Sequence, residues 1–432
     1  MSSPATFPRG GVRPPDRKDP AARLPIRRAC VPAVAVIPLR QSVQSAQCLV
    51  REGDAVQEGM LIGRASGPLS ADVHASIPGT VKELRRVTLP DGESSLAVVI
   101  GMGGEFSRTG RLPSARDWRE LGREQLLGKL QEGGVVDPAG VPAATRLRRA
   151  GRPEVLVVNG AESEPYLTAD ERLMVERAEE VLEGARIAAW ITGASSVLAG
   201  VAADRQEALR SMRQAAAGRE VRVVELEPKY PQQEERLMAF SAAGRKVPRG
   251  ARPEDVGVLV LDVGTLAAIR EAVVLGMPVL ERVVTVAGEG VLRPANLKAR
   301  LGTPAGELLE ECGGIPGGAV RLVAGGPLRG FTLSGPEAAL TKDMAGVLAL
   351  TRRELRPAAA SSCIGCGRCI EACPWGLRPA ELYKWLDCGE PGEAWGRGLR
   401  ECRECGCCAY VCPSRIPLLQ GLRSARKAGS PA

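Results

Sequence analysis

Two cysteine runs near the end of the chain have the spacing of iron–sulfur ligands. The first covers residues 363–374 and the second 402–413, and both follow the pattern C-x₂-C-x₂-C-x₃-C-P. In such a run three thiolates of one tight loop bind one [4Fe–4S] cube, and the fourth cysteine of a two-cluster ferredoxin binds the other cube. The spacing therefore predicts two crossed ligand sets: Cys363, Cys366, Cys369 and Cys412 for cluster 1, and Cys402, Cys405, Cys408 and Cys373 for cluster 2.

The remaining cysteines and the zinc alternative do not change this interpretation. Structural zinc sites use paired C-x₂-C units and do not require the regular third and fourth cysteines of each run. Cys388 and Cys407 fit neither ligand set and are expected to be packing residues. Ten of the thirteen cysteines lie after residue 360, in a chain with no recognisable signal peptide, so metal binding is favoured over disulfides.

The composition favours a globular protein of several domains. The 432 residues are 44% hydrophobic and carry a formal net charge of +8, which is compatible with weak attraction to acidic partners or anionic lipid heads. No basic stripe is interleaved with aromatic residues, so nucleic acid is not an expected partner. The longest uncharged stretch, 187–203, is too short to predict a transmembrane segment, and a cytoplasmic location is expected.

The first quarter of the chain predicts an extended lead-in over 1–25 and a β module over 26–111. Short apolar runs separated by turn residues are typical of a compact all-β unit. The stretches "VREGDAVQEGMLIG" and "VHASIPGTV" resemble the biotinyl/lipoyl barrel-sandwich pattern, without its modified lysine. The only histidine of the chain, His74, falls in this module and is expected to be structural.

The rest of the chain predicts a multidomain α/β protein. Alternating strands and helices over 112–278 indicate a doubly wound parallel α/β core of the Rossmann-like type. Within it, Thr168 and Glu171 predict a capping box that opens one long helix ending at Gly193. Residues 279–350 resemble a β-grasp (SLBB-like) module, and 355–432 predict a C-terminal α-helical two-cluster ferredoxin domain.

Taken together, the motifs resemble the RnfC subunit family of the Rnf (Rsx) membrane-associated electron-transport complex, which is related to the NADH-binding flavoprotein subunit of complex I. The stretches that carry the resemblance are "GGVRPPDRK", "VNGAESEPYLTADERLM", "KYPQQEERL", "ERVVTVAGEGV", "LGTPAGELLEECGG" and both cysteine runs. The resemblance implies NADH oxidation through FMN, with electrons passed over two [4Fe–4S] clusters to partner redox subunits. It also implies peripheral association, through those partners, with the cytoplasmic face of a membrane.

The resemblance places an FMN/NADH site in the α/β core, with the phosphate held by backbone N–H groups of a glycine-rich loop at a helix N-terminus. The residues that it implies there are Gly134, Gly140, Arg146, Asn159, Glu162, Glu164 and Asp262.

The sequence departs from the family pattern in this region. The family's "GGAGFPT", followed by a lysine, corresponds here to "GVVDPAGVPAATRLRR", in which Asp137 and Pro138 replace flexible glycine. Gln233 and Glu234 replace glycines of the family's "YPQGGE". Asp262 replaces an asparagine, and Ser163 replaces a cysteine.

Two functions follow from these observations. In the first, the chain is an NADH dehydrogenase subunit that uses FMN within an Rnf-type membrane complex. In the second, the flavin site is lost, and the chain is an iron–sulfur relay that serves a soluble partner reductase. The first is favoured slightly, because the resemblance covers nearly the whole chain and the changed loop is local.

Overall fold

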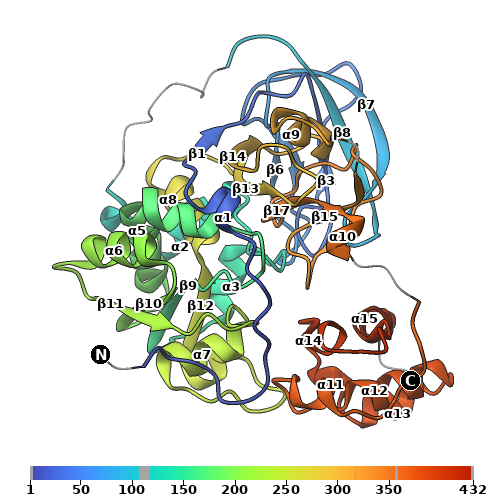
Figure 1. Cartoon of the computed structure of the whole chain (residues 1–432). Helices are drawn as coiled ribbons and strands as arrows, with labels where there is room; N and C mark the ends of the chain where they lie inside the picture. Colours follow the sequence, from blue (N-terminus) through green and yellow to red (C-terminus); the bar gives the residue numbers. More distant parts are fainter. Residues whose placement is uncertain (1–2, 107–116, 317, 356–358, 430–432) are drawn as a thin grey trace.

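The computed structural model describes residues 3–106, 117–316, 318–355 and 359–429. Four bodies follow one another along the chain: a pair of small β-sheets, a parallel α/β core, a six-stranded mixed sheet and a helical C-terminal domain (Figure 1). These are the barrel-sandwich module, the doubly wound core, the β-grasp module and the cluster domain that the sequence predicts. Among the described residues, no helix is long and apolar enough to cross a membrane.

The N-terminal module consists of two antiparallel sheets that face a shared apolar core. One sheet has the order β2-β8-β7-β4 and the other the order β3-β5-β6. Ile37, Ile62 and Ile100 are fully buried between them, and His74 is buried on β6. The strands are β2 (Val34–Pro38), β3 (Gln47–Cys48), β4 (Ala55–Val56), β5 (Leu61–Arg64), β6 (Val73–His74), β7 (Gly79–Thr88) and β8 (Ser94–Met102).

The α/β core is a parallel four-stranded sheet of order β11-β10-β9-β12. Strands β9, β10 and β12 are largely buried, as expected for a parallel sheet covered by helices, whereas the edge strand β11 is mostly half-buried. The chain runs outward from β9 to β11 and then returns to place β12 on the other side of β9, so the strand order reverses between β9 and β12. The strands are β9 (Val155–Gly160), β10 (Ser196–Ala202), β11 (Val221–Leu226) and β12 (Val258–Asp262).

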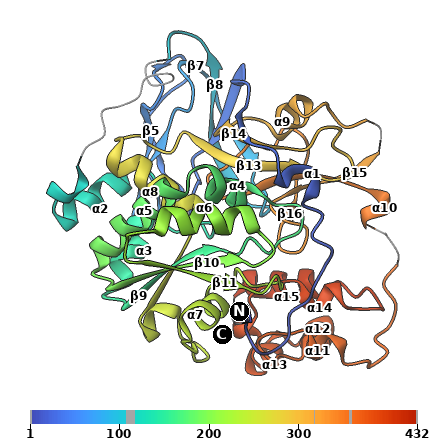
Figure 2. The ribbon, with the colours of Figure 1, turned by 60° about the vertical axis from the view of Figure 1, so that its left-hand side comes forward.

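Helices cover both faces of this sheet (Figure 2). Leu156 and Val158 of β9 share one apolar cluster with α5, α6 and α8. Val157, between them, belongs to a second cluster with α7. This alternation follows from the two-residue period of a strand. The helices are α2 (Arg123–Glu132), α3 (Ala143–Arg149), α4 (Ala169–Glu176), α5 (Ala178–Thr192), α6 (Gln206–Ala216), α7 (Glu235–Ala243) and α8 (Val263–Val274).

The prediction of one long helix from Thr168 to Gly193 is wrong. The helix is broken at Arg177, whose φ of −134° and ψ of 31° are not helical and separate α4 from α5. The capping box is also absent, because the Thr168 side chain donates to Asn296 Oδ1 at 2.8 Å instead of capping α4. A tertiary contact has therefore overridden a local capping signal.

The mixed sheet has the order β1-β14-β13-β17-β15-β16. Its edge strand β1 (Ile26–Arg28) pairs in parallel with β14, so residues 26–28 join this sheet although they lie at the start of the range predicted for the N-terminal module. The other strands are β13 (Glu281–Ala287), β14 (Ala295–Arg300), β15 (Ala319–Ala324), β16 (Phe331–Thr332) and β17 (Gly346–Thr351). Short helices α1 (Asp19–Ala22), α9 (Ala305–Glu311) and α10 (Arg352–Leu355) accompany the sheet.

The C-terminal domain consists of short helices and lies beside the α/β core, near α7 (Figure 1). Each cysteine run is a loop followed by one helical turn, α11 (Arg368–Glu371) or α14 (Cys407–Tyr410), and these two turns contact each other. The remaining helices are α12 (Pro379–Asp387), α13 (Pro391–Gly396) and α15 (Leu418–Ala428). The repeated loop and turn bring the two cysteine runs side by side.

Candidate redox site

Each predicted cysteine set lines a cavity of its own. The first cavity, of about 250 Å³, is lined by Cys363, Cys366, Cys369 and Cys412 together with apolar side chains. The second is smaller and is lined by Cys373, Cys402, Cys405 and Cys408. In both cavities the fourth thiol comes from the other run, as crossed ligation requires.

The donors suit iron–sulfur cubes. All thirteen cysteines are free thiols, and burial raises the pKa of Cys402 to about 11. At neutral pH such a thiol is protonated, and a positive metal centre would favour its thiolate form. Among the described residues, no three histidine, cysteine, aspartate or glutamate side chains are grouped to hold a single metal ion. A cube needs four separated thiolates, each on its own iron, and would carry one electron at a time.

The two cysteine loops have similar backbone conformations, with left-handed φ values at matching positions. Gly365 in the first loop has a φ of 68°, and Glu404 at the matching position of the second has 52°. Gly376 and Arg415 form a second matched pair, with φ of 66° and 52°. Such values are strained for residues with a Cβ, so the second run retains the loop shape of the first although Glu404 and Arg415 stand in place of glycine. Glu404 pairs with Arg423 at 3.1 Å.

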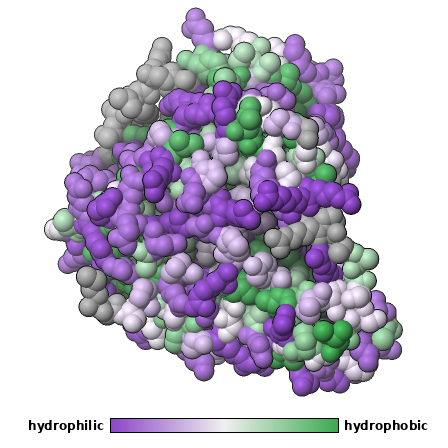
Figure 3. All heavy atoms as spheres, in the orientation of Figure 1, coloured by the Kyte–Doolittle hydropathy of each residue, from purple (hydrophilic) through white to green (hydrophobic). Residues whose placement is uncertain are grey.

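The two cavities differ in their exposure to solvent. Cys363 and Cys366 are exposed, and Ile364 between them is 70% exposed. All four cysteines of the second set are buried. Hydrophobic side chains gather on the lower part of the surface, over the region of the C-terminal domain, whereas the surface over the α/β core is mostly hydrophilic (Figure 3). Cluster 1 would therefore lie near the surface and cluster 2 in the interior.

The second cysteine set lies at the junction with the α/β core. Tyr230, 1% exposed, donates from its hydroxyl to the Cys405 carbonyl oxygen at 2.5 Å. The same hydroxyl lies 3.2 Å from Glu164 Oε1. Cys407 is fully buried in the same apolar cluster as Tyr230 and Cys405, which agrees with its expected packing role, whereas Cys388 is exposed, so the packing role expected for it is wrong.

A buried ion pair also fixes this junction. Arg236 of α7 pairs with Glu401 at 2.9 Å, with side chains only 7% and 9% exposed. The second carboxylate oxygen of Glu401 accepts from the Gly250 backbone N–H at 2.9 Å. The Arg236 guanidinium lies over the Trp375 ring, 5.3 Å from its centre. The core and the cluster domain are thus held together by paired, desolvated charges.

The strand order reverses between β9 and β12, whose carboxyl ends lie side by side. Open α/β sheets bind ligands at such points. Asn159 and Asp262 lie opposite each other in the register of the two strands. The Asn159 amide donates to the Gln233 carbonyl oxygen at 2.8 Å, and Asp262 caps α8 by accepting from the Thr265 backbone N–H at 2.9 Å. Both side chains are therefore engaged within the protein.

A compact ion cluster lies beside β12. Arg146 pairs with Asp137 at 2.9 Å, with Glu235 at 2.8 Å and with Glu254 at 3.4 Å. It also donates to the Val260 carbonyl oxygen of β12 at 3.2 Å. Burial raises the pKa of Asp137 to about 6, and Arg146 opposes this shift.

The structure places the two glutamates predicted for the flavin pocket in different surroundings. Glu162 caps α4, its carboxylate accepting from the backbone N–H groups of Asp170 at 2.9 Å and Glu171 at 3.0 Å. Glu164 faces the junction with the cluster domain, where it accepts from the Leu328 N–H at 3.1 Å. Burial raises the pKa of Glu164.

The two predicted loop glycines contact the N-terminal module. Gly134 has a φ of 61°, and a Cβ there would lie 2.2 Å from the Asp72 carbonyl oxygen. Its own carbonyl accepts from the buried Lys342 ammonium at 2.7 Å. Gly140 has a φ of 73° and accepts from the Val43 N–H at 3.0 Å. These contacts and the positive φ values explain why glycine stands at both positions, without a bound cofactor.

In this structure the loop predicted for the FMN phosphate and several side chains predicted for the flavin site are engaged by protein groups. The loop that would cradle its phosphate is closed by Asp137, whose carboxylate accepts from the Ala139 and Val141 N–H groups at 2.9 Å each. The following helix, α3, has seven residues and begins after Pro142. Asn159, Arg146 and Asp262 are already bound to protein groups, as described above. The roles predicted for these residues remain predictions.

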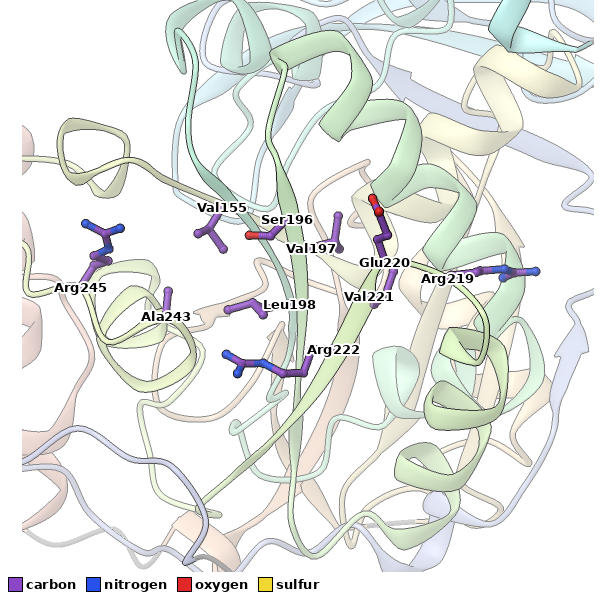
Figure 4. A pocket seen from close by; sticks show the side chains of 10 residues that line it. All are labelled: Val155, Ser196, Val197, Leu198, Arg219, Glu220, Val221, Arg222, Ala243 and Arg245. Carbon is purple, nitrogen blue, oxygen red and sulfur yellow. The ribbon is translucent and has the colours of Figure 1, made fainter.

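A cavity of about 500 Å³ opens at the opposite edge of the sheet, at the amino ends of β9, β10 and β11 (Figure 4). Arg222 and Arg245 flank its apolar floor, and Arg219 points away from it. Arg245 pairs with Glu154 at 2.5 Å. Asn159 and Asp262 lie at the carboxyl ends of their strands, where ligands of such sheets bind, so this cavity is separate from them. It is lined by Val155, Ser196, Val197, Leu198, Arg219, Glu220, Val221, Arg222, Ala243 and Arg245.

Family models match all four bodies of the chain. They are the RnfC barrel sandwich hybrid domain over 6–105, the Nuo51 FMN-binding domain over 132–271, the SLBB domain over 283–332 and the 4Fe-4S dicluster domain over 362–416. Fold and cysteine sets thus define an iron–sulfur protein built on an FMN-binding α/β domain of the Nuo51 type.

Similar proteins identify the family more closely. The chain is 36% identical to the C subunit of the proton-translocating ferredoxin:NAD(+) oxidoreductase complex of Clostridium ljungdahlii, over 87% of this chain and 83% of that protein. It is 37% identical to the C subunit of the ion-translocating oxidoreductase complex of Erwinia tasmaniensis, over 96% of this chain and 52% of that protein. The chain belongs to the RnfC family.

A solved structure supports the fold alone. The NAD+-reducing [NiFe]-hydrogenase in the H2-reduced state contains a chain that matches with a TM-score of 0.52 and 16% identity, over 77% of this chain and 68% of that one. At this identity the likeness carries no assignment of residues.

Sequence reasoning missed the residues that join the two redox domains. Tyr230 stands in the quoted stretch "KYPQQEERL", but nothing in that stretch indicates a contact with Cys405, which is 175 residues away. Arg236 and Glu401 are likewise 165 residues apart. Contacts between residues so far apart leave no signal in a local sequence pattern.

Proposed function

We propose that this chain is the electron-transfer subunit of an Rnf-type complex, carrying electrons over two [4Fe–4S] clusters between the nicotinamide couple and a ferredoxin-type partner. The observation that supports this most is the pair of crossed cysteine sets, each lining its own cavity. Family membership supplies the reaction class, since the Clostridium relative is a subunit of a ferredoxin:NAD(+) oxidoreductase complex. Association with the membrane would be peripheral and through partner subunits.

The structure also supports an order for the two clusters. The second set is buried at the junction with the α/β core, where Tyr230 contacts Cys405. The first set opens to solvent beside the exposed Ile364. Cluster 2 would therefore exchange electrons with the core side, and cluster 1 with a partner protein docked on the surface.

A second candidate function is a relay that receives electrons from another protein and not from its own flavin. The closed phosphate loop, in which Asp137 binds the Ala139 and Val141 N–H groups, favours it. Both candidates use the same two clusters and differ only in where electrons enter.

Metal analysis of the anaerobically reconstituted chain tests the shared function. We expect about eight irons and eight sulfides per chain, and bleaching of the cluster absorbance by dithionite. Cys366→Ser should lose the spectrum of one cluster, and the exposed Cys388→Ser serves as the matched control. Unchanged iron content in Cys366→Ser would contradict the assigned ligand set.

A further inference from the structure

The loop between Val136 and Pro142 has the shape of an anion-binding turn. Backbone N–H groups in such turns converge and bind phosphate or carboxylate. Here the N–H groups of Ala139 and Val141 both point to one oxygen, Asp137 Oδ1, at 2.9 Å each. The anion that occupies this turn is therefore part of the chain itself.

The second oxygen of the same carboxylate is also satisfied. Asp137 Oδ2 lies 2.9 Å from Arg146, which stands near the position of the family's lysine. Asp137 is only 4% exposed and Arg146 only 11%. The two N–H groups and the guanidinium that could bind a cofactor phosphate in this loop thus all contact one aspartate.

The charge around the loop opposes a further anion. Arg146 forms the ion pair with Asp137, while Glu235 and Glu254 also lie within ion-pair distance of Arg146. Three carboxylates therefore share one guanidinium. A phosphate group that entered with Asp137 in place would add its negative charge to this excess, next to an Asp137 side chain that is only 4% exposed and therefore weakly screened by water.

We propose that the Asp137 carboxylate, neutralised by Arg146, is an internal substitute for the FMN phosphate and excludes it from the loop. This inference rests on the proposed function, because it takes the 132–271 domain to be the FMN-binding domain. The chain then binds FMN weakly, and the phosphate, not the isoalloxazine ring, is the part that is rejected.

Flavin binding by the full reconstituted chain tests this inference. The affinity for FMN and for riboflavin, which lacks the phosphate, is measured by flavin fluorescence in the wild type and in Asp137→Gly. We expect wild type to lose FMN on desalting and Asp137→Gly to bind FMN at least tenfold more tightly, with riboflavin affinity unchanged. Asp54→Gly is the matched control, since Asp54 holds an exposed turn by accepting from the Arg51 N–H at 2.7 Å.

A second variant covers the case in which glycine disturbs the loop. Asp137→Asn combined with Glu235→Gln keeps the size of both side chains and removes two negative charges, so FMN affinity should again rise while riboflavin affinity does not. Stoichiometric FMN in the desalted wild type would overturn the inference. Equal gains in affinity for FMN and riboflavin, or no gain in FMN affinity in either variant, would also overturn it. Cluster content and dithionite bleaching report on the proposed function separately and should be the same in all of these proteins.

Discussion

The hydroxyl of Tyr230 donates to the carbonyl oxygen of Cys405 at 2.5 Å, across the junction between the α/β core and the cluster domain. Cys405 belongs to the buried ligand set, and Tyr230 also contacts Glu164. One side chain of the core thus holds the loop that would carry the interior cluster. Because electron transfer rates depend on distance, the proposed order, in which cluster 2 exchanges electrons with the core, depends on this contact.

Tyr230→Phe removes this contact and keeps the ring. A buried hydrogen bond contributes about 1 kcal/mol, so the midpoint of thermal unfolding should fall slightly. Hydrogen bonding around cluster ligands tunes their potentials, so the reduction potential of cluster 2 should shift while that of cluster 1 does not. A redox titration followed by electron paramagnetic resonance measures both. Tyr410→Phe, at a half-exposed position, is the control, and equal shifts of both clusters would contradict the prediction.

Gly365→Ala should weaken the first cysteine loop. Its φ of 68° is strained for alanine, which costs about 1 kcal/mol. Within the described part of the chain, no heavy atom beyond Gly365 and its two chain neighbours lies within 4 Å of the added Cβ, so the cost is conformational and not steric. We expect faster loss of iron from cluster 1 in a chelator challenge. Gly396→Ala, in helix α13 and equally open, should retain iron like wild type. Equal retention by both variants would contradict the backbone argument.

Glu401→Ala should separate the cluster domain from the core. Removing one partner of a buried ion pair costs about 3–5 kcal/mol, because the remaining charge is left without compensation. The pair formed by Arg213 and Glu225 is exposed, with side chains 50% and 39% accessible, so Glu225→Ala should have little effect on stability. Limited proteolysis and thermal unfolding report the difference. The double variant Arg236→Met with Glu401→Leu removes both charges and should recover much of the lost stability. If it does not, the loss in Glu401→Ala does not come from the unpaired charge.

The stability contributed by Asp137 should depend on pH. Burial raises its pKa from the ordinary 3.8 to about 6 in the folded chain. The folded state therefore holds this proton more tightly than the unfolded state does. The resulting stability is fully present below pH ~4 and is lost as the pH rises through 6.

The variant Asp137→Asn has no carboxyl group at this position and should not show this loss of stability. From pH 5 to pH 7.5, wild type should lose about 1 kcal/mol of stability relative to the variant. Thermal unfolding midpoints of the two proteins, measured side by side at each pH, give the difference. Parallel pH profiles would show that Asp137 does not titrate in this range.

The sequence by itself determined the parts of the molecule that depend on local spacing. Two C-x₂-C-x₂-C-x₃-C-P runs can present their thiols in only a few ways, because a tight loop fixes where each side chain points. The alternation of apolar strands and amphipathic helices likewise determined the parallel core, since strand and helix periods differ. Both features are readable within short stretches of the chain.

Only the tertiary structure decided what the polar residues of the core do. Thr168 has the sequence signal of a helix cap, yet it bonds to Asn296, and Glu162 caps the helix instead. Asp137 could be recognised as a departure from a glycine-rich loop, but not as the anion that fills it. A carboxylate binds whichever donors folding brings within about 3 Å, and those donors are set by chain segments far apart in sequence. Spacing could therefore predict the cysteine sets, whereas the closed flavin loop and the Tyr230 junction required the fold.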